Sequence, residues 1–123
     1  MGWEREALEI LDRTEEVEIE TTRPDGQRQR TIIWVVVQAE DVFVRSVRGD
    51  RGRWWQAAVD RPDEVALVFD GRRLEVRAES AIDGASIERC SRALEGKYTG
   101  DPSTPSMTRP EVLGTTLRLL PRQ

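Results

Sequence analysis

The fold is decided by the stretch TIIWVVVQAEDVFVRSVRGDRGRWWQAAVDRPDEVALVFD, which spans residues 31–70. An apolar run turns into a second strand pattern that ends on Arg45 and Ser46, and a loop rich in arginine and glycine follows. A short helix pattern then begins near Arg53 with the pair Trp54–Trp55. Guanidinium groups and backbone N–H groups should therefore lie beside aromatic rings, an arrangement that suits a flat, anionic ligand.

The flanking sequence predicts antiparallel strand pairs. Residues 16–22 alternate between apolar side chains and glutamates, which indicates a half-buried strand whose three glutamates face solvent. The run at 29–37 is β-branched on both faces, so we expect a central strand that is buried on both sides. Turn signals at 24–26 and 70–71 separate neighbouring strands. Further strands are expected at 42–46, 65–69, 72–78 and 113–119.

Six such strands leave few exposed edges if they curl, so we expect a mainly β (α+β) fold: a six-stranded antiparallel split β-barrel with short peripheral helices. Two helices are expected at 3–13 and 53–60. A third begins at Asp83, its N-cap, and carries apolar residues at helical spacing. On that spacing Cys90 is a small core residue. Tyr98 either ends this helix in the core or donates a proton to a reduced substrate.

The composition bounds what the chain can do. Its 123 residues fit a single domain, 1–123, in which the proline-rich stretch 101–110 is an irregular surface crossing. A net charge of −4 argues against nucleic-acid binding. With no histidine and one cysteine, intrachain disulfides, Ser-His-Asp catalysis and His-ligated zinc are excluded, and we expect no metal. The longest apolar run, 32–37, is too short for a bilayer, so we expect no membrane binding and a cytoplasmic protein.

The loop rich in arginine and glycine places several positive charges next to the start of a helix. Arg48, Arg51 and Arg53 crowd the start of a helix, where the helix dipole disfavours cations by a few tenths of a kcal/mol each, roughly. An anion at this point would turn that cost into a gain, because guanidinium and N–H groups would bind it together. A solvated basic loop has the same sequence pattern.

Two longer stretches carry a family resemblance. TTRPDGQRQRTIIWVVVQAEDVFVRS, residues 21–46, resembles the opening hairpin of the split-barrel superfamily of pyridoxamine phosphate oxidase and the deazaflavin-dependent reductases. GRWWQAAVDRPDEVALVF, residues 52–69, resembles the short helix of that superfamily and the strand after it. The Lys97–Tyr98 pair and the terminal TTLRLLPR, residues 115–122, are similar to its small members, among them the family called domain of unknown function 2255.

The resemblance implies a cofactor and an assembly. It implies a protein that binds FMN or a deazaflavin coenzyme and transfers hydride as an oxidoreductase to an unknown small molecule. It also implies a homodimer whose cofactor sites lie between two subunits. The cofactor phosphate would be bound by groups on two adjacent strands and at the start of the following helix. Trp54 or Trp55 would lie near the cofactor ring or the dimer interface. The residues that the resemblance implies to bind the cofactor are Arg30 (or Arg28 in its place), Arg45, Ser46, Arg53, Trp54 and Trp55. The loop pattern adds Arg48 to this candidate site.

Three alternatives stay open at this point. Arg28 and Arg30 pair with glutamates at 16, 18 or 20 across the hairpin and bind no ligand. One tryptophan of the pair is core, together with Ala58 and Val59, and the other is exposed, since successive helix residues cannot share one buried stripe. The whole protein is a non-catalytic split barrel that binds a small anionic or aromatic ligand or a protein partner. A hydrolase is disfavoured, because the chain has neither histidine nor a clear carboxylate pair.

Overall fold

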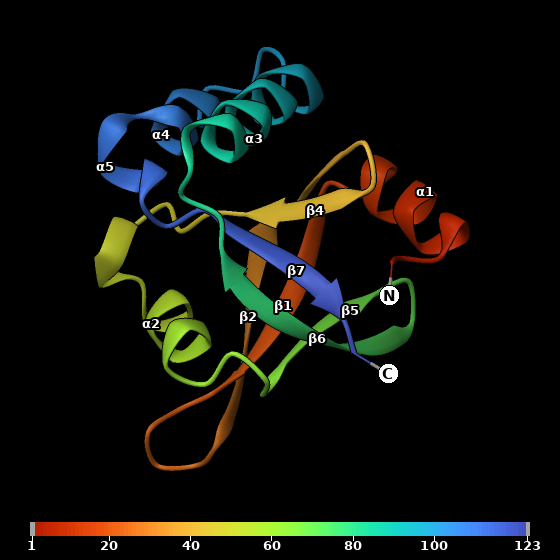
Figure 1. Ribbon diagram of the computed structural model, residues 1–123, viewed down its shortest axis with the longest axis vertical. Coiled ribbons are helices and arrows are strands. Elements are labelled where there is room, and N and C mark those ends of the chain that lie inside the picture. Colours follow the sequence, from red (N-terminus) through yellow and green to blue (C-terminus); the bar gives the residue numbers. More distant parts are fainter. Residues whose placement is uncertain (1, 123) are drawn as a thin grey trace.

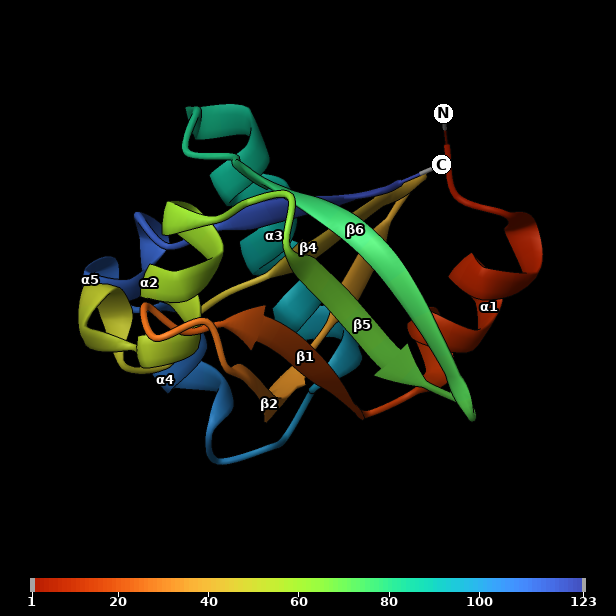
Figure 2. The same cartoon turned by 90° about the horizontal axis from the view of Figure 1, so that it is seen from below.

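Seven strands form one antiparallel sheet in residues 2–122, the residues that this computed structural model describes. Their order in the sheet is β2-β1-β5-β6-β7-β4-β3, and Figure 2 shows the sheet curling from β1 through β5 and β6. The strands are β1 (Glu16–Thr22), β2 (Arg28–Trp34), β3 (Val36–Gln38), β4 (Asp41–Val44), β5 (Val65–Phe69), β6 (Arg72–Ser80) and β7 (Leu117–Pro121).

The two ends of this strand order are consecutive in the chain. β2 pairs with β1 at one end, β3 pairs with β4 at the other, and only Val35 separates the two strands. A strand that bends to pair at both ends of a sheet curls the sheet into a partly closed barrel. The expected split barrel is therefore confirmed. The sheet has seven strands where six were predicted, because the bend divides one predicted strand into β2 and β3.

The expectation that 29–37 is a central strand buried on both faces is wrong. β2 pairs only with β1, and the side chain of Ile32 is 63% exposed. Burial is concentrated after the bend, where Val35 and Val36 are 0% and 1% exposed. A β-branched run favours a strand in either setting, so the sequence pattern does not distinguish an edge strand from a central one.

Helices lie around the curled sheet, and Figure 1 shows α3, α4 and α5 gathered on one side of it. The stretch 101–110, expected to be irregular, contains α4 and the start of α5. Pro105 and Pro110 stand in the first turns of these helices, where the missing N–H of proline has no partner to lose. No helix within residues 2–122 has the length and apolarity needed to cross a membrane. The helices are α1 (Arg5–Arg13), η1 (Gly49–Arg51), α2 (Arg53–Asp60), α3 (Gly84–Lys97), α4 (Thr104–Thr108) and α5 (Pro110–Leu113).

Local signals for turns and caps are confirmed. Asp70 and Gly71 both have positive φ, 52° and 72°, as the two central residues of a type I′ hairpin require. The Asp83 carboxylate accepts a hydrogen bond of 3.1 Å from the N–H of Ser86 and caps α3. These features depend on a few neighbouring residues, which is why the sequence predicts them well.

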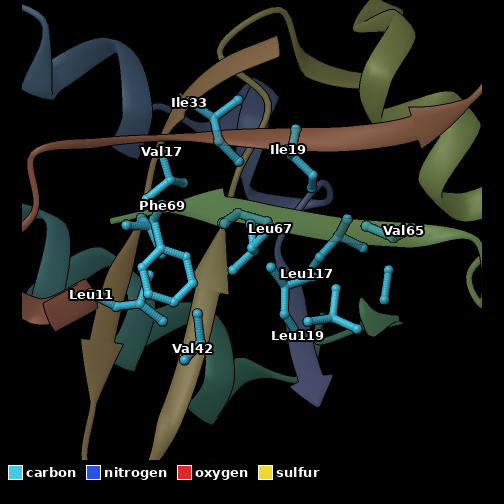
Figure 3. Packing of buried hydrophobic residues seen from close by; sticks show 14 of the residues in the cluster. Leu11, Val17, Ile19, Ile33, Val42, Val65, Leu67, Phe69, Leu117 and Leu119 are labelled. Carbon is cyan, nitrogen blue, oxygen red and sulfur yellow. The ribbon is translucent and has the colours of Figure 1, made fainter. Parts of the chain in front are cut away.

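The main core fills the inside of the barrel. In Figure 3, side chains from α1 and from strands on opposite sides of the barrel point toward one another around Phe69 and Leu67. A second cluster lies between β3, β4 and the helices α3 and α4, and it contains Cys90, which is buried as expected. The labelled core residues are Leu11, Val17, Ile19, Ile33, Val42, Val65, Leu67, Phe69, Leu117 and Leu119.

Candidate functional site

A cavity of about 540 Å³ lies where β2, the end of β4, the arginine and glycine loop and α4 meet. This volume is in the range of about 300–1,000 Å³ that is usual for small-molecule sites. The edge strand β2 forms one wall, and residues 45–48 with the start of α2 form another. The apolar part of its surface comes from Ile32, Ile33, Trp34, Val47, Trp54 and Met107.

Ser46 lies in the wall of this cavity and has an unsatisfied hydroxyl group. The residue is 1% exposed; its N–H donates to Thr115 Oγ1, and its carbonyl accepts from the N–H of Gly49. Within residues 2–122 its Oγ has no hydrogen-bond partner. Gly52 packs directly on it, so a Cβ at that position would collide with Ser46 Oγ. A buried hydroxyl without a partner costs about 1–3 kcal/mol, so this group has hydrogen-bonding capacity that the fold does not use.

Arg48 and Arg53 line the rim of the same cavity, and both are exposed. Among the ion pairs of residues 2–122, neither guanidinium lies within 4.0 Å of a carboxylate. The N-cap of α2 is Gly52, which has no side chain to satisfy the free N–H groups of the first helical turn. The only carboxylate among the described lining residues is Glu16, so the rim carries an excess of positive charge.

Arg45 also lines the cavity, but its guanidinium group is engaged by the protein. The residue is 2% exposed. Its Nε donates to Thr116 Oγ1 at 2.8 Å, its Nη1 to Ser91 Oγ and the Met107 carbonyl, and its Nη2 to the Ile87 carbonyl. These bonds use four of the five N–H donors of an arginine. Burial lowers the pKa of Arg45 below its ordinary value. Arg45 therefore joins β4 to α3, α4 and the start of β7, and one donor is left for a ligand.

The tryptophan pair does not divide into one core and one exposed residue, as was expected. Trp54 and Trp55 are both half-buried, and both pack against the main core. The helix that carries them contacts both β1 and β6 of the sheet. Val59, expected in the core, is 44% exposed. Trp54 lines the cavity, whereas Trp55 does not.

Arg28 and Arg30 are not part of the cavity wall, and both form the expected ion pair with a glutamate of β1. Arg30 lies 3.2 Å and Arg28 3.9 Å from the carboxylate of Glu20. Arg73 of β6 pairs with the same carboxylate, and its hydrogen bond is the main cause that lowers the pKa of Glu20. The expectation that all three glutamates of β1 face solvent is wrong for Glu20, which is 6% exposed, because two arginines of β2 and one of β6 surround it.

Tyr98 supports the cavity from behind. It is 5% exposed, as a core tyrosine should be, and its ring stacks on Trp34 with the ring centres 3.8 Å apart. Its hydroxyl donates to the Glu15 carbonyl at 2.6 Å and accepts from the N–H of Val35, and burial raises its pKa to about 12. The neighbouring Lys97 ammonium donates to the carbonyls of Leu11 and Val35. Both residues therefore hold the bend between β2 and β3 in place.

Sequence reasoning missed Trp34 and Met107 as walls of the cavity. Trp34 lies inside a run that was expected to be buried on both faces, and Met107 inside a segment that was expected to be irregular. No local pattern marks either residue, because the wall combines segments separated by tens of residues. The pairing of a strand tryptophan with a helix-terminal tyrosine becomes visible only when the two rings are placed together.

The sequence matches the model of the family described as "Uncharacterized protein conserved in bacteria (DUF2255)" over residues 7–119. The chain belongs to the DUF2255 family. The resemblance to the family called domain of unknown function 2255 is thereby confirmed. No curated protein matches the sequence.

Solved structures agree with the fold of this DUF2255 protein. A conserved hypothetical protein from Mycobacterium tuberculosis is 19% identical with a TM-score of 0.77, covering 100% of this chain and 82% of its own. A Listeria innocua protein named after pyridoxamine 5'-phosphate oxidase is 13% identical with a TM-score of 0.68, covering 96% and 92%. An F420 reductase is 21% identical with a TM-score of 0.61, covering 94% and 92%. At these identities the likeness establishes the fold alone.

Proposed function

We propose that this DUF2255 protein binds a flat, phosphorylated cofactor of the flavin type, FMN or a deazaflavin coenzyme, in the cavity beside Ser46. The observation that carries the proposal is the Ser46 hydroxyl, which is buried in the cavity wall without a hydrogen-bond partner among the described residues. Arg48 and Arg53 stand at the same cavity without carboxylate partners. Hydroxyl, guanidinium and helix N–H groups together are the donor set that a phosphate takes.

The remaining walls fit the ring of such a cofactor. Trp34 and Trp54 provide aromatic surface, and Ile32 and Val47 provide exposed aliphatic surface. A flavin-type group, when bound, supplies hydride transfer, so the protein needs only to bind and orient it. This division of work agrees with a chain that has no histidine. In this proposal the protein is an oxidoreductase that acts on a small molecule.

A homodimer is part of the proposal. β2 is an edge strand, and an unpaired strand edge is a natural surface for association. Ile32 and Val47, at the mouth of the cavity, are 63% and 48% exposed. A second copy that covers these side chains would also close the open side of the cavity.

The test is a titration of the purified protein with FMN and, separately, with the deazaflavin coenzyme, followed by tryptophan fluorescence. Saturable quenching is expected, because Trp34 and Trp54 line the cavity. Arg53→Ala should weaken binding about tenfold, roughly the value of one charge-assisted contact. Ser46→Ala should weaken binding without loss of stability, since it removes a hydroxyl that the fold leaves unpartnered.

Arg51→Ala is the matched control. Arg51 belongs to the same loop and is exposed, and it does not line the cavity. The control removes the same charge and should leave affinity within about twofold. If Arg51→Ala and Arg53→Ala weaken ligand binding equally, the loss of affinity comes from the change in net charge alone, and the proposed site is contradicted. Absence of quenching by either ligand would remove the cofactor proposal.

A non-catalytic binding module is the second candidate, and one observation favours it. Glu16 is the only carboxylic acid among the described lining residues, and no cysteine, tyrosine or lysine joins it in the wall. A cavity with so few groups able to exchange protons suits binding without turnover as well as cofactor-borne hydride transfer. Binding of FMN with no oxidation of the reduced cofactor by any acceptor tested would favour this second candidate.

A further inference from the structure

The cavity beside Ser46 has two ends of opposite charge. Its wall follows β2 from Gln29 to Trp34, a length of strand that spans roughly 17 Å. Arg53 lies at the Gln29 end, because Arg53 and Gln29 also share the wall of a neighbouring cavity. Glu16 lies at the Trp34 end, because β1 and β2 pair these two residues directly. A ligand that fills the cavity therefore meets a cation at one end and a carboxylate at the other.

The carboxylate of Glu16 is not used by the fold. The residue is exposed, and its side chain takes part in no ion pair or hydrogen bond among residues 2–122. Directly opposed residues of an antiparallel pair carry their side chains on the same face, with Cβ atoms about 5 Å apart. The Glu16 side chain therefore lies beside that of Trp34, and its charge is available to a group in the cavity.

The ring of Trp34 provides an aromatic surface next to this charge. One face of the ring stacks on Tyr98, with ring centres 3.8 Å apart. Trp34 is half-buried and lines the cavity, so part of its ring is open to a ligand. Burial, together with the negative charges of Glu15, Glu16 and Asp101, raises the pKa of Tyr98 to about 12. An electron-rich ring in such surroundings attracts organic cations.

Arg45 is a cation in the same wall, and its charge opposes that of Glu16. Its guanidinium group is buried and donates to four protein oxygens, among them the carbonyls of Ile87 and Met107. These oxygens offset part of its field, whereas no group among residues 2–122 pairs with Glu16. The unpaired carboxylate therefore sets the sign of the charge beside Trp34.

We propose that the small molecule on which the proposed oxidoreductase acts is an organic cation, a protonated or quaternary amine, held between Glu16 and Trp34. This inference rests on the proposed function and narrows it to a substrate class. A phosphate bound by Ser46 and Arg53 directs the cofactor ring toward the Trp34 end, and a molecule that exchanges hydride must lie against that ring. Glu16 is then a specificity-determining residue, which selects by charge and takes no part in the hydride transfer.

The experiment titrates the purified protein with choline and with dimethylbutanol, the neutral alcohol in which a carbon atom replaces the choline nitrogen. Both titrations are made with and without saturating FMN. The readout is the NMR signal of the Trp34 indole N–H, which is identified by its absence in Trp34→Phe. Choline should bind about fivefold more tightly than the alcohol, roughly the value of a cation–π contact combined with an exposed ion pair. Bound FMN should keep or increase this preference.

Glu16→Gln removes the charge at nearly constant shape, and the position is exposed, so the variant should fold. It should reduce the preference for choline to less than about twofold and leave the affinity for the alcohol unchanged. Glu18→Gln is the matched control, because Glu18 lies on the same face of β1, forms no ion pair among residues 2–122 and does not line the cavity. This control should keep the full preference.

The outcomes separate this inference from the proposed function. A preference for choline that depends on Glu16 and persists with FMN bound supports the inference. Equal binding of choline and the alcohol, equal loss of preference in Glu16→Gln and Glu18→Gln, or displacement of choline by FMN would overturn the cationic substrate while the cofactor site stands. Failure of FMN and the deazaflavin coenzyme to quench tryptophan fluorescence would overturn the proposed function, and the substrate class with it.

Discussion

Arg45 at the inner end of the cavity and Arg53 on its rim belong to the same short stretch of sequence and line the same space, yet their surroundings are opposite. Arg45 is 2% exposed and directs four N–H groups to protein oxygens. Arg53 is exposed and has no carboxylate partner among residues 2–122. The difference teaches that the donors which the fold leaves unoccupied, rather than the residue type, indicate where a ligand binds.

The largest effect should come from Arg45→Met. This change leaves the carbonyls of Met107 and Ile87 and two hydroxyls without their donor in the interior, so we expect a loss of about 3 kcal/mol in the free energy of unfolding. Urea denaturation measures it. Arg48→Met, with the same change of side chain on the rim, should stay within about 0.5 kcal/mol of the unaltered protein. Equal stability of the two variants would break the comparison.

Glu20 is a second charged residue in the interior that can be compared with the exposed arginines Arg48 and Arg53 on the rim. Its carboxylate is held by Arg73 and Arg30, whose hydrogen bonds lower its pKa below 4.5. Because the pKa is lower in the folded state, this stabilisation is present above pH 4.5 and is lost as the pH falls through the folded value. Glu20→Gln should cost about 2 kcal/mol at pH 7 and flatten the loss of stability in acid.

Glu18→Gln is the matched control for Glu20, because it lies on the same face of β1 and forms no ion pair among residues 2–122. The stability of Glu18→Gln should fall with decreasing pH in the same way as that of the unaltered protein. Parallel denaturation midpoints of all three proteins between pH 3 and pH 7 would show that the arginines around Glu20 contribute nothing measurable.

Removing the arginines on the rim of the cavity should not lower the stability of the protein, in contrast to the changes at Arg45 and Glu20. The double variant Arg48→Ala, Arg53→Ala removes cations from the N-terminus of α2 and should keep or raise stability, by roughly a few tenths of a kcal/mol. Its remaining affinity for FMN should depend less on sodium chloride than that of the unaltered protein, since fewer exposed charges take part in binding. A stability loss above about 1 kcal/mol would mean that these arginines belong to the fold, as Arg45 does.

The smallest effect on FMN affinity is expected from Arg30→Gln. Arg30 is one of three arginines around Glu20, and its side chain is 48% exposed, so its loss should cost less than about 1 kcal/mol. FMN affinity should not change, because Arg30 does not line the cavity. A clear fall in affinity would instead restore the cofactor role that the family resemblance implied for this position.

Much of the fold could be predicted because its signals are local. The strand at 16–22, the hairpin at 70–71 and the cap at Asp83 each depend on residues a few positions apart, and each agrees with the structure, although burial along the strand alternates only as far as Ile19. The bend at Val35 was missed, because a continuous β-branched run carries no mark of the point at which its pairing partner changes. The helices α4 and α5 were missed because proline was taken to prevent a helix, whereas it is tolerated in the first turn.

By itself, the sequence determined most of the strands, the helices α1, α2 and α3, the absence of histidine chemistry, and the stretch that supplies much of the cavity wall. Tertiary structure alone decided which arginine serves the fold and which is free for a ligand. The acceptors of Arg45 stand 42, 46, 62 and 71 residues away along the chain, so no local pattern distinguishes it from Arg48 or Arg53. A guanidinium group has the same donors everywhere, and only the oxygens that folding brings within about 3 Å decide whether those donors are already used.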